Sequence, residues 1–442
     1  MNWCGRFQKH DQQPKARPVP PRQRLPLHSR KPLLMWGYES MAEQHLSQLE
    51  PKATDIRRIT GGLAVPRAVI IGPIAAYIAF VMEFTLVPLL LPAIQSQFGL
   101  SVGDLAWVFN SYGAAVAIGV LFCGYFGDTL NIRRVFGLGV ALFATGALVS
   151  AIAQNYETLV AGRLLQGFGS GVFSPLVPIY LTRASPDTPG RALILWGSIA
   201  GYIAAFAPLL YGNLLGDHSW RLAFVFIAII AACAWVLLTR SQLSQDPEPA
   251  TSCKRDYREI LRSRDLLITF AYVFCTYGSI TYYIFRLPIW LSENEIGASS
   301  IGLFLSVAWL TFSFISTLLR NLVDRHHILG IMLAAPLLIA VAVLLLFNHQ
   351  SFLLVALSSI LIGAGLACSN APSTQLILRF APEGMTAVSA SLDITFARIG
   401  GIATISILAW MEGGYADLTI CVLCLLALVC AQSVSRSRIG TG

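Results

Sequence analysis

Beyond residue 65, long apolar segments alternate with short polar connections along almost the whole chain. An α-helix needs about 20 apolar residues to cross about 30 Å of hydrocarbon, and twelve segments reach this length. In lipid each segment must be a helix, because its backbone groups have no water to bond. The predicted spans lie near residues 69–93, 105–124, 135–154, 157–181, 192–214, 221–239, 267–290, 299–319, 327–347, 352–376, 384–410 and 415–434. The fold class that we expect is an all-α integral membrane protein with twelve transmembrane helices.

Basic residues concentrate in every second connection between these spans. On the side of the N-terminus they are Arg133, Arg134, Arg183, Arg191, Arg240, Lys254, Arg255, Arg258, Arg262, Arg264, Arg320, Arg325 and Arg379. The opposite connections hold only Arg221. Because Lys and Arg favour cytoplasmic connections, we expect an even number of spans with both termini in the cytoplasm. We expect the protein to lie in the plasma membrane, which in this case would be a bacterial inner membrane.

Polar segments divide the chain into parts. The first of them is basic and Pro-rich, with 11 of the 31 Lys and Arg residues, which is typical of a disordered tail. Met41 offers an alternative translation start. The parts that we expect are a cytoplasmic tail (1–64), an N-terminal six-helix half (65–240), a cytoplasmic linker (241–264), a C-terminal six-helix half (265–434) and a second cytoplasmic tail (435–442).

An internal repeat relates the two halves at an offset of 196 residues. The corresponding positions are Asp128 and Asp324, Gly167 and Gly363, and Gly169 and Gly365. Repeated halves with matching polar and glycine positions are typical of transporters that bind their substrate at the interface of the halves. We therefore expect the two six-helix halves to be pseudo-symmetric.

Composition agrees with a membrane protein and excludes several functions. Only 12% of the residues are charged and 55% are apolar, whereas soluble proteins carry roughly 25% charged residues. The chain has no Gly-Lys dipeptide and hence no phosphate-binding P-loop, and the metalloprotease and hydrolase motifs are absent. The basic residues behind the net charge of +8 lie mainly in the N-terminal segment and in the connections on one side of the membrane, so we expect no nucleic-acid partner. We also expect no enzymatic activity, no cofactor and no metal site.

The connection after the second span reads Gly124-Tyr-Phe-Gly-Asp128-Thr-Leu-Asn-Ile-Arg133-Arg134. It resembles the G-x-L-A-D-R-x-G-R-K/R signature of the major facilitator superfamily, with Phe126 in place of the Leu and Asn131 in place of the second Gly. The resemblance implies a cytoplasmic gate whose charged contacts depend on conformation. We expect this gate to comprise Gly124, Asp128, Arg133, Arg134, Asp324 and Arg325. The alternative is a solvated charged loop.

Two spans of the N-terminal half carry polar residues where the family has coupling motifs. Arg163-Leu-Leu-Gln-Gly-Phe-Gly169 is similar to the R-x-x-Q-G-x-G motif of proton-coupled members. Val81-Met-Glu83-Phe-Thr85-Leu-Val-Pro-Leu-Leu-Leu-Pro92 resembles the L-D-x-T-I-V-N-V-A-L-P motif of drug:proton antiporters, and Glu83 stands at the position of the Asp. The resemblance implies that Glu83 and Arg163 couple transport to protons. Alternatively, Glu83 is a carboxyl group satisfied by a neighbouring helix.

Further polar residues in the spans are candidates for a substrate cavity. They are Thr85, Tyr112, Gln166, Tyr277, Asp393 and Arg398. A charged side chain inside a span is a functional candidate by default, because burying it in lipid costs at least a few kcal/mol. Asp393 and Arg398 are five residues apart, or about 140° around a helix, and are poor partners for each other. Alternatively, each forms a structural pair with a neighbouring helix, and Arg286 extends to the outer surface.

The motifs together resemble the drug:proton antiporters, especially a branch built with fourteen spans, although this chain has twelve predicted spans. The resemblance implies that two halves rock about a central cavity to export a drug or a secreted metabolite such as a siderophore, driven by the proton gradient. The export motif G-P-x-x-G-G is only partly present, as Ala207-Pro208-Leu-Leu-Tyr211-Gly212. The alternative is proton-coupled uptake of a nutrient or organic anion, with Arg163, Arg286 and Arg398 as anion partners. The partners that we expect are a small molecule, protons and lipid, with the monomer as the functional unit.

Overall fold

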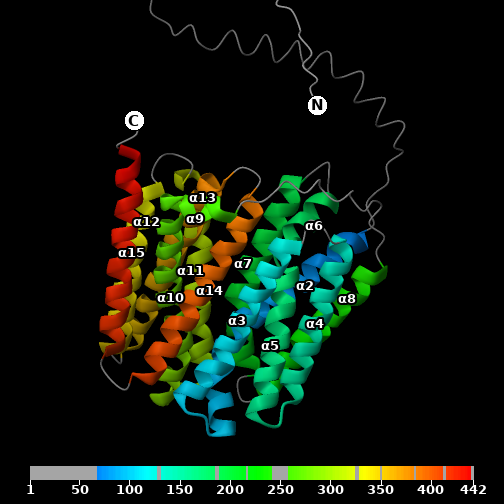
Figure 1. Cartoon of the computed structure of the whole chain (residues 1–442). Coiled ribbons are helices and arrows are strands. Elements are labelled where there is room, and N and C mark those ends of the chain that lie inside the picture. The colour runs from blue at the N-terminus through cyan, green and yellow to red at the C-terminus, as the bar shows by residue number, and fades with distance from the viewer. Residues whose placement is uncertain are drawn as a thin grey trace, which may run out of the picture. The chain divides into compact units, whose positions relative to one another are not determined.

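The helices of the chain form a bundle in which most axes run roughly in one direction (Figure 1). The computed structural model describes residues 67–126, 131–184, 189–215, 218–240, 257–323, 328–348, 351–382, 385–411 and 415–439. The N-terminal half contains α2 (Arg67–Phe98), α3 (Val102–Phe126), α4 (Ile132–Ile152), α5 (Tyr156–Phe173), α6 (Leu176–Ala184), α7 (Pro189–Leu214) and α8 (Arg221–Arg240). After the short α9 (Tyr257–Arg262), the C-terminal half contains α10 (Arg264–Glu293), α11 (Ala298–Val323), α12 (Ile328–Asn348), α13 (Phe352–Phe380), α14 (Thr386–Trp410) and α15 (Tyr415–Ile439).

The predicted spans coincide with these helices, so the predicted all-α membrane fold is confirmed. Eleven helical segments of the described chain are long and apolar enough to cross a membrane. The remaining predicted span, 192–214, coincides with α7, a helix of 26 residues. The fourth span is interrupted at Ser174 and Pro175, so that α5 and α6 share it. Pro175 lacks a backbone N–H and cannot continue the ladder of α5.

The repeat at an offset of 196 residues recurs in the packing of the helices. A Cβ atom on Gly167 of α5 would overlap the carbonyl oxygen of Tyr112 on α3, and one on Gly363 of α13 would overlap that of Ala308 on α11. Both residues of the second pair, Gly363 and Ala308, lie 196 residues after their counterparts in the first pair, Gly167 and Tyr112. A second pair of contacts follows the same offset: Gly169 with Phe143, and Gly365 with Ile339. Glycine at these positions lets the helices approach closely, and the halves are pseudo-symmetric, as predicted.

Apolar packing joins the two halves at one end of the bundle. We call this the closed end; it is where α2 ends and α3 begins. A single core there combines residues of both halves, among them Leu91 of α2, Phe224 of α8, Phe285 of α10 and Phe304 of α11. At the opposite end, which we call the open end, each half keeps a core of its own.

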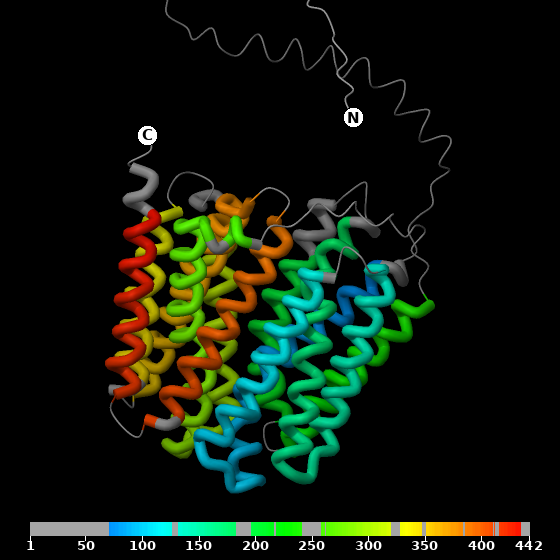
Figure 2. Tube along the Cα trace, in the orientation of Figure 1, coloured from blue at the N-terminus to red at the C-terminus, as the bar shows by residue number. Residues whose placement is uncertain are grey.

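Two helix pairs carry most of the interface between the halves. Helix α3 packs along α14, and α7 packs along α11; Figure 2 shows α3 in cyan beside α14 in orange. Asn110 of α3 donates to the Ile402 carbonyl (3.3 Å) and to the Ser406 hydroxyl (3.0 Å) on α14. Within the described residues, neither α5 nor α6 forms a packed interface with α13. The core shared by both halves therefore lies at the closed end, whereas toward the open end each half has a core of its own and the halves still touch where Gly124 of α3 lies against Ser391 of α14.

Arg221 ties three helices together at the closed end of the N-terminal half. Its guanidinium donates to the Gln97 side chain (2.7 Å) and to the Ala153 carbonyl (2.6 Å), and it lies 4.4 Å from the centre of the Trp220 ring. Hydrogen bonds that involve a charged group contribute about 1.5–3 kcal/mol each. We therefore expect Arg221→Ala to lower the melting temperature of the purified protein by several degrees, measured by thermal unfolding in detergent.

Arg240 at the other end of α8 provides the control for this variant. Its side chain is exposed, so Arg240→Ala should leave the melting temperature within about one degree of the parent, since surface substitutions change stability little. Equal melting temperatures for the two variants would contradict the role of Arg221 as a tie between helices.

Candidate functional site

A buried polar cluster joins α2 and α5 in the N-terminal half. Glu83 of α2 forms an ion pair with Arg163 of α5. Gln166, less than one turn further along α5, donates to the second carboxylate oxygen of Glu83 (2.7 Å) and accepts from Arg163 (3.0 Å). The three side chains are at most 1% exposed. Both oxygens of the Glu83 carboxylate therefore have a donor in a site that excludes water.

The remaining surface of the Arg163 guanidinium is covered by α3 and α8. Its Nε atom donates to the Val108 carbonyl (3.2 Å), and its central carbon lies 4.4 Å from the Tyr112 ring centre and 5.8 Å from that of Phe224. A guanidinium over an aromatic face is attracted by the ring quadrupole. The glycines of α5 allow this enclosure, because α3 and α4 approach its backbone at Gly167 and Gly169.

The cluster depends on both of its charged members. Breaking a buried ion pair by neutralising one partner costs about 3–5 kcal/mol, since the other charge is left uncompensated. Without the charge of Glu83, Arg163 would be left as such a charge. The structure thus brings together the two residues predicted to couple transport to protons, and adds Gln166, which we assigned to the cavity. The ion pair also fits the alternative interpretation, in which Glu83 is a structural carboxyl group whose partner lies on a neighbouring helix.

Thr85 lies apart from this ion pair in the present conformation. Its hydroxyl is buried and donates to the Val81 carbonyl one turn back on α2 (2.8 Å). Such a bond to the preceding turn is common for Ser and Thr in membrane helices. Of the predicted cavity residues on α2, α3 and α5, Tyr112 and Gln166 therefore contact the charged pair and Thr85 does not.

A second polar cluster lies in the C-terminal half. The Tyr277 hydroxyl of α10 donates to the Asn370 side chain of α13 (2.6 Å), and the Thr374 hydroxyl donates to the Asp393 carboxylate of α14 (2.8 Å). Asp393 and Arg398 form no ion pair with each other in the described chain, for which their angular separation on α14 is the physical reason. Sequence reasoning missed Asn370 and Thr374; polar side chains within an apolar span were the available signal.

The residues of the predicted gate are only partly described. Asp128, Asp324 and Arg325 lie outside the described residues. Gly124 lies against Ser391 of α14, where a Cβ atom would come within 2.6 Å of the Ser391 hydroxyl oxygen. This close approach brings the halves into contact along α3.

The two arginines of the gate segment belong to the start of α4. Arg133 donates to the carbonyls of Leu238 (3.3 Å) and Thr239 (3.0 Å) near the end of α8, so it bonds within its own half here. The Arg134 side chain is exposed. Asn131, which departs from the family signature, accepts the Arg134 backbone N–H (3.1 Å) as the N-cap of α4, a position that favours Asn.

Arg286 is neutralised near the closed end of α10. It forms two hydrogen bonds of 2.9 Å to the carboxylate of Glu293 on the same helix. This bidentate pair lies close to the end of the helix and apart from both polar clusters. Arg286 is therefore a weaker candidate for an anion partner than Arg398.

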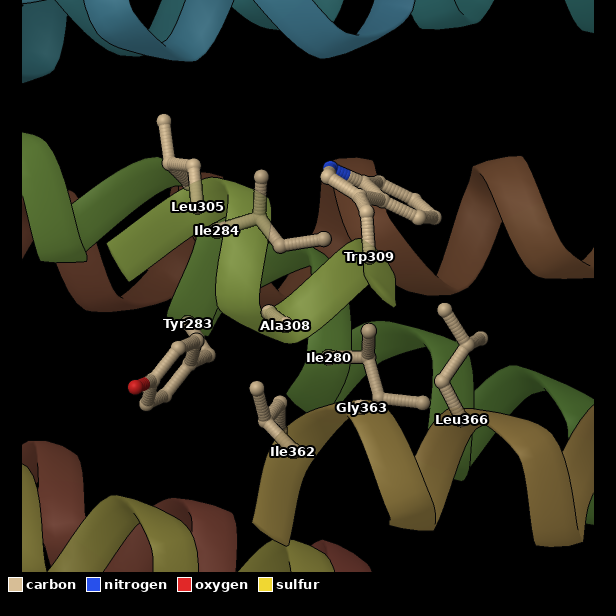
Figure 3. A pocket seen from close by; sticks show the side chains of 9 residues that line it. All are labelled: Ile280, Tyr283, Ile284, Leu305, Ala308, Trp309, Ile362, Gly363 and Leu366. Carbon is tan, nitrogen blue, oxygen red and sulfur yellow. The ribbon is translucent and has the colours of Figure 1, made fainter. Parts of the chain in front are cut away.

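A small crevice in the C-terminal half is apolar and lies apart from the charged residues. It is lined by residues of α10, α11 and α13, among them Tyr283, Trp309 and Ile362 (Figure 3). Its volume is about 10 Å³, which is room for no more than one water molecule. Trp309 extends from it toward the N-terminal half, where its ring centre is 4.7 Å from that of Phe84. This crevice is a packing feature of the closed end.

Comparisons with known proteins agree with the predicted membrane fold. The sequence model described as Major Facilitator Superfamily matches residues 74–405. The "Uncharacterized MFS-type transporter EfpA" of Mycobacterium tuberculosis (strain ATCC 25618 / H37Rv) is 27% identical over 330 residues, which cover 69% of this chain and 58% of that protein. The "Drug efflux pump JefA" of the same strain is 30% identical over 38% of this chain and 34% of that protein. The "Cephamycin export protein CmcT" of Amycolatopsis lactamdurans is 34% identical over 33% of this chain and 30% of that protein. The matched parts thus span less than two thirds of the length of these relatives, from 58% down to 30%.

Solved structures share the fold at low sequence identity. A peptide transporter POT in complex with sulfate gives a TM-score of 0.71 at 14% identity, covering 86% of this chain and 96% of that one. A bacterial homologue of the human lysosomal transporter Spinster, in an inward-facing and unoccupied conformation, gives 0.66 at 13% identity over 85% of this chain and 98% of that one. These likenesses concern the fold alone.

Proposed function

Because this chain belongs to the major facilitator superfamily, we propose that it is a proton-coupled transporter that exports a small organic or amphipathic compound. The observation that carries the proposal is the buried ion pair between Glu83 and Arg163, with Gln166 bound to both. A carboxylate sealed from water beside an arginine is the kind of group that binds a proton in one conformation and releases it in another. Two similar proteins are named an efflux pump and an export protein, which supports the export direction.

The proposed cycle uses the two ends of the bundle. The open end faces the cytoplasm in this proposal, as the loop charges predict, and both termini lie there. The present conformation is then inward-facing, with Glu83 ionised and paired with Arg163. In the outward-facing conformation Glu83 takes up a proton from outside and the substrate leaves. Asp128, Arg133 and Arg134 latch that second conformation, and the proton gradient across the plasma membrane drives the cycle of the monomer without a cofactor.

Efflux assays in intact bacterial cells test this proposal. Cells that produce the protein and cells that carry an empty vector would be loaded with three fluorescent probes: a lipophilic cation, an amphipathic carboxylate, and a quinolone that carries both a carboxylate and an amine. We expect lower accumulation of at least one probe in producing cells, and equal accumulation in both strains once an uncoupler removes the proton gradient. Higher accumulation in producing cells would instead support the uptake of a nutrient or organic anion.

A further inference from the structure

We propose that Arg398 and Tyr112 form a subsite that binds a carboxylate group of the transported compound. The inference rests on the proposed function, since it assigns a substrate class to the interface between the two moving halves. It is carried by the position of Arg398 on α14, by its lack of a counter-ion and by the unused hydroxyl group of Tyr112.

Arg398 lies on the face of α14 that packs against α3. Ser391, two turns before Arg398, lies against Gly124 of α3. Ile402, one turn after Arg398, lies 3.7 Å from the position that a Cβ atom on Gly113 of α3 would take. Residues seven and four positions apart share a helix face, so these two contacts bracket Arg398. Its side chain is half-buried and lies in the neighbourhood of Tyr112 of the N-terminal half and Tyr277 of the C-terminal half. Arg398 thus lies where the two halves meet.

The charge of Arg398 is not compensated by the described residues. The other arginine in the middle of the bundle, Arg163, is paired with Glu83. The carboxylate of Asp393 accepts from Thr374 and lies on a different face of α14. No ion pair or side-chain hydrogen bond joins Arg398 to any residue of the described ranges. An arginine in a membrane span normally faces a partner or a cavity, because burying a lone charge is costly, and an anionic ligand is the partner that completes this site.

Tyr112 supplies a hydrogen-bond donor on the opposite half. Its side chain is buried, and its hydroxyl group makes no hydrogen bond with the described residues. The Tyr112 O–H has no acceptor within hydrogen-bond distance among the described residues, and buried hydroxyl groups without partners are rare in proteins.

Charge balance favours a carboxylate over a phosphate as the bound group. One guanidinium carries one positive charge, and a carboxylate carries one negative charge, whereas a phosphate monoester carries about −1.5 to −2. The planar guanidinium also matches the two oxygens of a carboxylate in a bidentate arrangement. The tyrosine hydroxyl would then donate to one of the same oxygens.

A pair of probes that differ only in the acidic group tests the subsite. The quinolone carboxylate and its methyl ester would be compared for binding to the purified full-length protein in detergent and for efflux from cells. We expect the wild type to bind the carboxylate at least tenfold more tightly than the ester. Arg398→Gln should weaken carboxylate binding about tenfold or more, which is the fold-change for loss of one charge-assisted hydrogen bond, and should leave ester binding unchanged.

Two further variants separate recognition from folding. Arg398→Lys keeps the charge and should retain part of the preference for the carboxylate over the ester. Tyr112→Phe keeps the ring beneath Arg163 and should reduce this preference less than Arg398→Gln does. Removing an uncompensated charge should raise the melting temperature of Arg398→Gln in the absence of ligand. A melting temperature below that of the wild type would indicate a structural role for Arg398 and overturn the subsite.

The outcomes distinguish this inference from the proposed function. Carboxylate binding that depends on Arg398, without efflux of either probe, would keep the subsite and contradict the export of such compounds. Uncoupler-sensitive efflux of acid and ester at equal rates, unchanged in Arg398→Gln, would keep the proposed function and overturn the subsite. Equal binding of acid and ester by the wild type would overturn it as well.

Discussion

Replacing Glu83 by Gln is expected to abolish uncoupler-sensitive efflux of every probe that the wild type exports. Glutamine keeps the size of the side chain but cannot take up or release a proton, so the conformational cycle loses its link to the gradient. The substitution also leaves Arg163 buried without its counter-ion. We therefore expect a loss of stability of about 3–5 kcal/mol, visible as a lower melting temperature of the purified protein.

A double variant separates the loss of transport from the loss of stability. In Glu83→Gln with Arg163→Gln, both charges are removed and three neutral amides can bond to one another and to the Val108 carbonyl. We expect this protein to melt at a higher temperature than the single variant and still to show no uncoupler-sensitive efflux. Recovery of efflux together with stability would mean that the pair is structural and that the proton is carried elsewhere.

Glu157→Gln is the matched control for these variants. Glu157 lies in the first turn of α5, the helix that also carries Arg163, and its side chain is exposed. Its replacement should change neither the melting temperature nor the rate of efflux. Wild-type efflux in Glu83→Gln, measured in the same cells at equal protein level, would refute the coupling role of Glu83.

Gly212→Val is expected to keep the closed end from sealing. A Cβ atom on Gly212 of α7 would lie 2.6 Å from the Ala298 carbonyl oxygen of α11, and Gly302 of α11 makes the reciprocal contact with α7. Backbone atoms cannot move aside as a flexible side chain can, so a valine must force the two halves apart there. Because closure of this end is one half of each cycle, we expect efflux to fall at least tenfold.

Distances between spin labels across the closed end measure this effect directly. Ser96 on α2 and Ser292 on α10 are exposed and line a cavity of about 290 Å³ at this end, so labelled cysteines at these positions suit the measurement in a background without native cysteines. We expect a longer distance in Gly212→Val than in the parent. Gly197→Val on the same helix has no atom within 4 Å of its Cβ position and should leave the distance and the efflux unchanged.

The sequence predicts the membrane helices well because each has to satisfy its own backbone in lipid. Length and apolar content therefore locate the spans without knowledge of their neighbours. The break at Ser174 and Pro175 within the fourth span was not predicted, since apolar residues continue on both sides of it. Proline alone was no signal for it, because α2 continues through Pro88 and Pro92.

Contacts between distant helices could be predicted only where a motif links them. The resemblance to proton-coupled transporters assigned Glu83 and Arg163 to one function, and the structure places them in contact. No motif includes Asn370, which bonds to Tyr277 across 93 residues. The unused hydroxyl of Tyr112 is a property of three-dimensional packing. Periodicity along one helix carries no information about which side chain of another helix will face it.

The uncompensated charge of Arg398 has an electrical consequence. A membrane potential acts on a net charge that moves through it, with about 2.3 kcal/mol per elementary charge per 100 mV for the full thickness of the membrane. The ion pair of Glu83 and Arg163 is neutral and moves no net charge when the halves rock. Arg398 moves a net charge when Asp393 on the same helix is uncharged, in proportion to the fraction of the field that it crosses. A carboxylate bound beside Arg398 cancels this charge. The membrane potential then acts on the conformational change of the empty transporter and has almost no effect on the conformational change of the transporter with its substrate bound.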